Sequence, residues 1–280
     1  MIGKGVSHGA LSVINAISTG KGAAFGIDLK TEATVQLIPE PEFSVEIDGH
    51  PAEDTTLARF SVEEILQRYP GSGMNGAVIR TTSNIPISKG LKSSSSAANA
   101  IISAAAEALS VRIDPLEIGR IGATAAMKAG VSITGAFDDA CACQLGGLVF
   151  TDNLERELLL RRPMPEGFTA VIHIPSFQIR KSAFPMEKMR EMRDMVSAAY
   201  DLAIEGDVFS AMYVNGRCTC EAIGITPEIS DKALSCGAAA AGLSGTGPAT
   251  GILVNADRLD EFLDRFGRED ILIANIRNGM

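Results

Sequence analysis

Alternating polar and apolar positions mark strands along the first part of the chain. The alternation runs through residues 31–38 (TEATVQLI), 42–48 (EFSVEID) and 75–83 (NGAVIRTTS), and a period of two is typical of strands that bury one face. A turn (GHP) follows the first two segments, which predicts that they are antiparallel strands. After this turn, residues 56–69 (TLARFSVEEILQRY) carry apolar side chains at helical spacing.

An alanine-rich helix follows the third strand and begins beside four consecutive serines. Residues 97–110 (AANAIISAAAEALS) favour a helix, so Ser93–Ser96 stand where a loop leads from a strand into that helix. Farther along, Asp114 before Pro115 predicts the start of a second helix, which can end at Gly130.

The rest of the chain mixes helices with short apolar strands. Residues 155–167 (ERELLLRRPMPEG) combine charge with two prolines, which indicates a domain boundary, and we divide the chain into units 1–160 and 161–280. Helices segregated from a small sheet are typical of an α+β fold. The elements expected after Gly130 are a short helix containing Cys141, a strand at 146–153, a strand at 169–175, helices at about 183–204, 208–223 and 228–241, a strand at 249–254, a helix at 257–266 and a strand at 270–276.

Composition indicates a soluble globular protein without a strongly basic surface. The 280 residues are 46% hydrophobic, which suffices for one large domain or two modest ones. The sequence has no apolar run as long as a membrane span and no secretory signal, so the expected compartment is the cytoplasm. The net charge of −9 argues against a nucleic-acid surface, because such a surface clusters lysines and arginines.

The five cysteines suit neither a disulfide framework nor a metal cluster. Cys141 and Cys143, like Cys218 and Cys220, lie two residues apart within expected helices, where their side chains point to different sides; Cys236 stands alone. An odd number of cysteines without a secretory signal indicates reduced thiols. We therefore expect small, buried packing residues.

The serine-rich junction NIPISKGLKSSSSAANA has the features of a phosphate site. The first NH groups of a helix lack internal partners and lie at the positive end of the helix dipole. Gly90 would let the backbone approach a ligand, the serines add hydroxyl groups, and Lys89 and Lys92 add positive charge. The alternative is a solvated loop in which a serine only caps the helix.

Other glycine-rich segments also bear on whether the chain has a phosphate site. The clusters at 18–26 (STGKGAAFG) and 241–251 (AGLSGTGPATG) favour a phosphate site over a simple cap. Residues 71–76 (GSGMNG) match the letters of the dinucleotide fingerprint, but they precede a strand instead of opening a helix, so we expect a turn. The lysine in residues 20–22 (GKG) lacks the serine or threonine that follows it in a P-loop, so any ATP site must lack that motif.

A second candidate site is the acidic pair Asp138 and Asp139 in GVSITGAFDDACA. The pair stands where a glycine-containing loop meets a short helix, so one carboxylate could cap the helix while the other faces a substrate. Such pairs are often only capping and solvated residues. In a kinase, an aspartate that accepts or orients a hydroxyl proton is the expected catalytic group.

Together these motifs resemble the GHMP small-molecule kinases, which include galactokinase, homoserine kinase and mevalonate kinase. PISKGLKSSSSAAN resembles their second motif, AGLSGTGPATG their glycine-rich third motif, and TGAFDDACACQLGG the segment that carries the catalytic aspartate of mevalonate kinase. Within this superfamily the chain most resembles the archaeal-type shikimate kinases, through INAISTGKGAAFGIDL, GLKSSSSAANA, TGAFDDACA, GGLVFTDN and AGLSGTGP.

The resemblance implies a fold, a reaction and a set of site residues. The fold would join an N-terminal domain like the second domain of ribosomal protein S5 to a ferredoxin-like C-terminal domain. The reaction would transfer the γ-phosphate of ATP, with Mg²⁺, to the 3-hydroxyl of shikimate, on the pathway to chorismate and aromatic amino acids. Asp138 would be the base and Ser94 a Mg²⁺ ligand. The residues implied to wrap the ATP phosphates are Pro86, Ile87, Ser88, Lys89, Gly90, Leu91, Lys92, Ser93, Ser94, Ser95 and Ser96, and those implied to close the site are Gly242, Ser244, Gly245, Thr246 and Gly247.

The sequence departs from the family pattern at three places. Lys92 replaces the usual second glycine of the second motif, which argues against a left-handed backbone there but adds a charge near the phosphates. Met127 stands where mevalonate kinase has a Mg²⁺-binding glutamate, which leaves Asp139 and Glu117 as candidate second ligands. The motif-one lysine of mevalonate kinase has no clear counterpart, because residues 8–10 occupy that region.

The acceptor is the least determined part of the expected reaction. A partner for its carboxylate is sought among Lys21, Arg80, Lys128 and Arg180. The nearest alternative is a GHMP kinase for homoserine, mevalonate or pantoate. A non-catalytic nucleotide-binding module is a second alternative, and the presence of Asp138 beside the phosphate loops counts against it.

Overall fold

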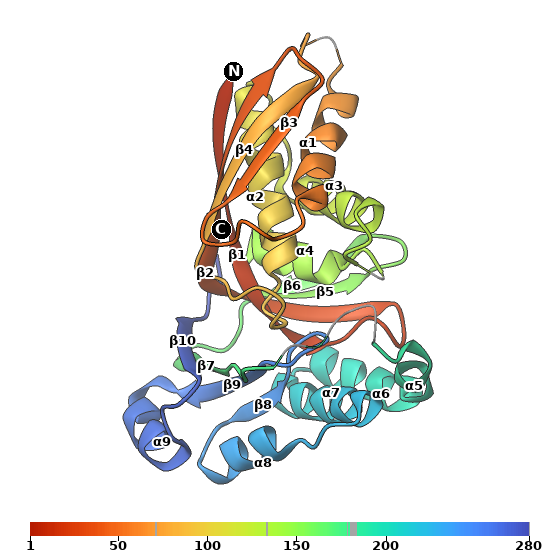
Figure 1. Cartoon of the computed structure of the whole chain (residues 1–280). Helices are drawn as coiled ribbons and strands as arrows, with labels where there is room; N and C mark the ends of the chain where they lie inside the picture. Colours follow the sequence, from red (N-terminus) through yellow and green to blue (C-terminus); the bar gives the residue numbers. More distant parts are fainter. Residues whose placement is uncertain (71, 133, 178, 180–183, 280) are drawn as a thin grey trace.

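A long N-terminal hairpin connects the two halves of the molecule. The computed structural model describes residues 1–70, 72–132, 134–177, 179 and 184–279. Strands β1 (Ile2–Ile14) and β2 (Lys21–Ile38) pair antiparallel, and in Figure 1 this red hairpin runs from the upper half down to the lower half. The glycine cluster at 18–26 is therefore a turn and a strand, not a phosphate-binding loop, because residues 21–25 pair with β5 (Leu148–Asp152).

The first sheet has, within the described residues, six strands in the order β3-β4-β2-β5-β6, with β1 paired to β2. Residues 31–38 and 42–48 run antiparallel, as expected, but they are not neighbours in the sheet. Strand β3 (Phe43–Ile47) pairs parallel with β4 (Gly76–Ser83), which separates it from β2. The physical reason for the parallel pairing is the helix α1 (Thr56–Arg68) between β3 and β4, which makes the connection a crossover. Strand β6 (Glu157–Arg162) pairs with β5 at the other side.

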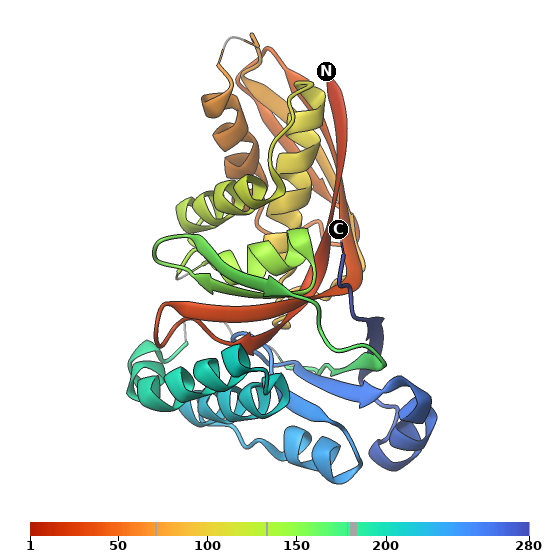
Figure 2. The ribbon, with the colours of Figure 1, turned by 180° about the vertical axis from the view of Figure 1, so that it is seen from behind.

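Helices α1, α2 (Ser93–Ala108) and α3 (Pro115–Lys128) gather on one face of this sheet, as Figures 1 and 2 show. The alanines of α2 allow a very close approach to β1. A Cβ atom added to Gly5 would lie 2.1 Å from the carbonyl oxygen of Ala100, so only glycine fits there. Helix α3 begins as predicted, with the Asp114 side chain accepting a hydrogen bond from the Leu116 NH.

The second sheet has, in the described part of the chain, four antiparallel strands in the order β10-β7-β9-β8. The predicted helix at 208–223 is confirmed as α7, whereas the helix expected at 228–241 ends at Ser235 because residues 240–243 pair with β9. Residue 183, the start of another expected helix, lies outside the described residues. The elements of this half are β7 (Phe168–His173), α5 (Met186–Glu191), α6 (Arg193–Glu205), α7 (Val208–Ile223), α8 (Glu228–Ser235), β8 (Ala240–Leu243), β9 (Thr250–Asn255), the 3₁₀ turn η2 (Ala256–Arg258), α9 (Leu259–Phe266) and β10 (Ile271–Asn275).

One apolar core extends across both sheets. It combines Phe25 from β2 with Ile172 from β7 and Met212 from α7, so the hairpin is packed from both sides. Strand β6 occupies part of the segment 155–167, and the chain passes between the sheets after Arg162. Among the described residues, no helix combines the length and apolar character needed to span a membrane.

Both cysteine pairs lie in helices, as predicted. Cys141 and Cys143 are buried in α4 (Phe137–Leu145), and Cys218 and Cys220 are buried in α7. All are free thiols, and burial raises the pKa of Cys220 to about 11. Cys141 and Cys143 pack in an apolar cluster around α4, and Cys218 packs in the core shared by both sheets.

Candidate active site

A cavity of about 800 Å³ lies where the N-terminus of α2, the first turn of α4 and the β8–β9 loop meet. Several residues implied by the family motifs line it: Ser88, Gly90, Lys92, Ser93, Ser94, Ser95, Asp138, Gly245, Thr246 and Gly247. The remaining residues implied by the motifs are not part of this lining: Pro86, Ile87, Lys89, Leu91, Ser96, Gly242 and Ser244.

The helix α2 begins at Ser93, as the serine-rich junction predicted. Its first NH groups have no intrahelical partners, and within the described residues the hydroxyls of Ser93, Ser94 and Ser95 have no hydrogen-bond partner. The Ser96 hydroxyl is buried, also without a partner among the described residues. The cavity therefore has a wall of unused donors at the positive end of a helix dipole, which suits phosphate.

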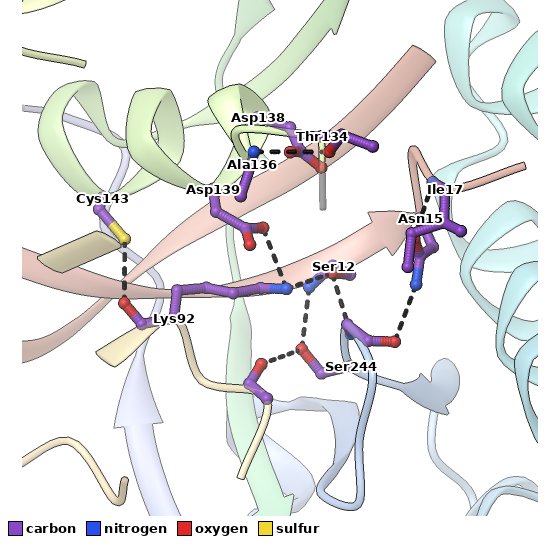
Figure 3. Close-up of polar contacts among 12 residues, drawn as sticks. Ser12, Asn15, Ile17, Lys92, Thr134, Ala136, Asp138, Asp139, Cys143 and Ser244 are labelled. Carbon is purple, nitrogen blue, oxygen red and sulfur yellow. Dashed lines mark hydrogen bonds and ion pairs between the residues drawn. The ribbon is translucent and has the colours of Figure 1, made fainter. Parts of the chain in front are cut away.

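Lys92 adopts the left-handed conformation that its side chain was expected to prevent. Its φ of 67° and ψ of 30° place it at the N-cap of α2, so the expectation drawn from the missing glycine is wrong. The ammonium lies 3.0 Å from Asp139 Oδ1 and donates a 2.7 Å hydrogen bond to Ser12 Oγ (Figure 3). Only 4% of the side chain is exposed, and a buried ammonium needs such partners. Lys92 thus combines a buried ion pair with a left-handed backbone conformation, which is unfavourable for residues other than glycine.

Lys89 has a different environment from the one expected for a phosphate ligand. Its ammonium donates hydrogen bonds to the carbonyl oxygens of Pro175, at 2.6 Å, and Phe177, at 2.9 Å. The Ala249 NH in turn donates to the Lys89 carbonyl oxygen. Lys89 thus links the serine-rich loop to the second half of the molecule.

The β8–β9 loop contacts the serine-rich loop through the Ser244 side chain and through a close approach of the two backbones. Ser244 Oγ donates to the Gly90 carbonyl oxygen at 2.8 Å and accepts from the Ser12 NH at 3.1 Å. A Cβ atom on Gly90 would lie 2.2 Å from the Ser244 carbonyl oxygen, and one on Gly245 would lie 2.6 Å from Lys92 Nζ. These glycines are needed for the close approach of the two loops.

Gly242 differs from the other residues implied to close the site. It belongs to β8, and a Cβ atom there would lie 2.3 Å from the Met212 carbonyl oxygen in α7. Its small size serves the packing of a strand on a helix.

Asp138 is a buried carboxylate at the base of the cavity. Asn153 Nδ2 donates to its Oδ1 at 2.8 Å, and the Asp138 NH donates back to Asn153 Oδ1. Burial, followed by the charge of Asp139, raises the pKa of Asp138 from its ordinary value of 3.8 to about 7. A Cβ atom on Gly22 would lie 2.4 Å from Asp138 Oδ2, so the strand β2 covers this carboxylate directly.

The cavity also offers oxygen ligands for a cation. Ser94, Asp138 and Asp139 all line it, and Mg²⁺ is usually bound by one or two protein carboxylates together with substrate phosphates. Glu117 does not fit the role of second ligand, because it lies outside the cavity lining and within 3.8 Å of Arg68. Met127 is half-exposed, and its sulfur accepts from Arg156.

The cations proposed to bind an acceptor carboxylate lie elsewhere. Lys21 sits 5.6 Å from the ring centroid of Tyr200, Arg80 pairs with Glu46, and Lys128 pairs with the buried Glu64. Among the described residues none of these three lines the cavity. Arg180 is outside the described residues.

The motif search missed several polar residues of the site. Ser12 and Asn15 come from the end of β1, and Asn15 Nδ2 donates to the Gly245 carbonyl oxygen at 3.0 Å. Glu53 and Asp54 contribute carboxylates from the loop before α1. Asn153 comes directly after β5. For Ser12, Asn15 and Asn153, the sequence offered only their position at the end of a strand. Polar residues are common at such positions, so the position alone did not identify them.

Comparison with known proteins identifies the family. Residues 56–147 match the model of the GHMP kinases N terminal domain. The shikimate kinase of Methanococcoides burtonii is 44% identical over 269 residues, covering 95% of this chain and 92% of its own. That of Methanothrix thermoacetophila is 44% identical over 255 residues, 91% of this chain and 86% of its own.

Solved structures agree on the fold. The mevalonate kinase of Methanococcus jannaschii has a TM-score of 0.77 at 19% identity, covering 100% of this chain and 98% of its own. The α+β architecture expected from the motifs is thereby confirmed. With the sequence relatives, it follows that this chain belongs to the GHMP kinases, in the family of the archaeal shikimate kinases.

Proposed function

We propose that this protein transfers the γ-phosphate of ATP to the 3-hydroxyl of shikimate, producing shikimate 3-phosphate. The observation that carries the proposal is one cavity in which the unused hydroxyls and NH groups of α2 lie together with the carboxylates of Asp138 and Asp139. The relatives named shikimate kinase, which align over most of this chain, support shikimate as the acceptor.

The phosphates would bind at the start of α2, where the backbone from Gly90 to Ser95 provides donors. Ser94 and one carboxylate oxygen of the Asp138–Asp139 pair would hold Mg²⁺. When bound, the ion neutralises charge on the β- and γ-phosphates. Gly245 and Gly247 would cover the phosphates from the second half of the molecule and exclude water, which limits hydrolysis of ATP.

Asp138 would act as the base. Its raised pKa, near 7, suits a group that accepts a proton at neutral pH. The proton of the 3-hydroxyl passes to the Asp138 carboxylate, the hydroxyl oxygen bonds to the γ-phosphorus, and the bond from that phosphorus to the bridging oxygen breaks to release ADP. Asp139, neutralised by Lys92, would orient the acceptor.

The proposal extends to domain organisation and location. Residues 1–160 would form the ATP-binding unit and residues 161–280 the unit that closes over it, in a cytoplasmic enzyme. The change of sheet after Arg162, two residues beyond this boundary, supports a division in this region, and the hydrogen bond of Ser244 to Gly90 supports closure of the second unit over the first.

A coupled ADP-release assay with Mg-ATP and shikimate, homoserine, mevalonate or pantoate tests the function. We expect turnover with shikimate, and phosphorus NMR of the product should locate the phosphate on the 3-hydroxyl. Turnover only with another acceptor would keep the kinase chemistry and reject shikimate. No turnover with any of them would favour a non-catalytic nucleotide-binding module.

A further inference from the structure

The helix that carries the acidic pair is short, and its N-cap residue does not cap it. Helix α4 spans Phe137–Leu145, and helices of this length are marginal by themselves. Its N-cap, Ala136, is left-handed with a φ of 49° and provides no side-chain cap. Asn153 and Lys92 bond directly to the two carboxylates, so the orientation of Asp138 and Asp139 depends on these contacts and on what holds the other end of α4.

Two arginines bond to the opposite end of α4. Arg277 donates to the Cys143 carbonyl oxygen at 2.8 Å and to that of Ala142 at 3.5 Å. Arg161 donates to the carbonyl oxygens of Leu145, at 2.7 Å, and Gly146, at 2.9 Å. The final carbonyl groups of a helix lack internal partners and carry negative partial charge, which these guanidinium groups neutralise.

Arg277 reaches α4 from the second sheet. It follows β10, whose last residue, Asn275, donates to the Asp28 carboxylate, and the Arg277 NH donates to the Gly26 carbonyl oxygen at 2.9 Å. The Gly147 NH donates to the Arg277 carbonyl oxygen at 2.7 Å. Residues 275–278 thus form a backbone connection from the second sheet to β2 and the end of α4.

Ordinary charge pairing does not account for this arrangement. Within the described residues, neither Arg161 nor Arg277 has a carboxylate within ion-pair distance. Burial, with a smaller effect from the nearby charge of Arg161, lowers the pKa of Arg277. The acceptors of the Arg277 guanidinium are the carbonyl oxygens of Ala142 and Cys143 in α4 and that of Gly279.

We propose that Arg277 is a positioning residue that fixes α4 from its C-terminal end and so keeps the acidic pair in place in the cavity. A nine-residue helix is only about 13 Å long, so a shift of its last turn is transmitted to its first. Misplacement of a catalytic group by about 1 Å can lower turnover about 100-fold. This inference rests on the proposed kinase function.

Arg162 provides a matched control. It is partly buried like Arg277, and it donates to the carbonyl oxygens of Ala203 and Ile204 at the end of α6. Helix α6 lines no part of the cavity among the described residues. Loss of either arginine removes the same kind of helix-end contact, but only one of these helices carries the acidic pair.

The test compares Arg277→Gln with Arg162→Gln in the full chain, well below the unfolding temperature of each variant. We expect Arg277→Gln to lower kcat at least about tenfold with little change in KM for ATP, and Arg162→Gln to stay within about twofold of the wild type. Millimolar guanidinium ion should partly restore kcat of Arg277→Gln. If Arg277→Gln does not fold, Arg161→Gln removes the neighbouring guanidinium, with the same loss of kcat expected.

Equal kcat values for the Arg277 and Arg162 variants would overturn the inference, as would a change confined to KM. An inactive wild type would instead reject the proposed function, so the two failures can be told apart.

Discussion

Lys92 and Asp139 form a largely buried ion pair, with 3.0 Å between Nζ and Oδ1, although Lys92 stands at a left-handed helix cap. The pair joins the start of α2 to the start of α4. Ser12 and Gly245 pack against the same ammonium, so one charge connects segments from both halves of the molecule. Its removal should affect both stability and turnover.

A double-mutant cycle with Lys92→Met and Asp139→Asn measures this pair. Loss of one partner leaves the other buried and unpaired, so each single variant should lose about 3 kcal/mol of unfolding free energy. The double variant should recover part of that loss, with a coupling energy above about 1 kcal/mol in urea denaturation. The exposed pair of Arg80 and Glu46, at 2.9 Å, is the control and should couple by less than about 1 kcal/mol. Equal coupling energies in both cycles would mean that burial does not strengthen the pair of Lys92 and Asp139.

Gly245→Ala should impair the site more than the fold. The added methyl group would lie 2.6 Å from Lys92 Nζ, so either the ammonium or the β8–β9 loop must move. Gly224→Ala is a matched control, because Gly224 is also left-handed but has no atom within 4 Å of an added Cβ. Both variants should lose about 1 kcal/mol of stability, whereas only Gly245→Ala should lower kcat/KM for ATP, by about tenfold or more. Similar kinetics for both would mean that the contact with Lys92 is unimportant.

Asp138 should give kcat/KM a pH dependence near neutrality. A base must be ionised, and the pKa of Asp138 is about 7, so kcat/KM should rise as pH increases through that value. Asp138→Asn should lose most of kcat, with little change in nucleotide affinity measured by calorimetry. Turnover of Asp138→Asn equal to that of the wild type would remove Asp138 from the mechanism.

The same carboxyl should affect stability in the opposite direction. Because its pKa is raised from 3.8 to about 7 on folding, the folded state retains a proton that the unfolded state has lost in this range. The contribution of Asp138 to unfolding free energy is therefore fully present below pH 3.8 and is lost as pH rises through about 7. Asp138→Asn should raise the Tm at pH 8 relative to wild type, and a lower Tm there would contradict the burial of a charged Asp138.

Ser94→Ala should weaken the use of Mg²⁺. If the Ser94 hydroxyl is a ligand, the Mg²⁺ concentration for half-maximal turnover should rise by about tenfold or more at saturating ATP. Ser103→Ala is the control on the same helix, because Ser103 Oγ only donates to the Asn99 carbonyl oxygen. An unchanged Mg²⁺ requirement in Ser94→Ala would mean that the Ser94 hydroxyl is not a ligand and that the acidic pair binds the ion.

Local patterns predicted several helices, although these helices also pack on distant strands. The alanine-rich helix α2 and the helix α7 follow from helix propensity and apolar spacing, and Ser93 begins α2 as the junction indicated. The hairpin of β1 and β2 was not predicted before Thr31, and β8 was divided between the end of an expected helix and the start of a glycine-rich segment. Short apolar segments of this kind adopt strands because a partner strand supplies their hydrogen bonds.

The sequence by itself determined the family motifs, their order and the helix start that offers donors to phosphate, because these depend on residue type and short spacing. Only the tertiary structure decided that Lys92 reaches Ser12, 80 positions away, and that Arg277 reaches Cys143, 134 positions away. Such contacts arise when strand pairing and core packing bring distant segments together. Burial in that packed arrangement also raises the pKa of Asp138.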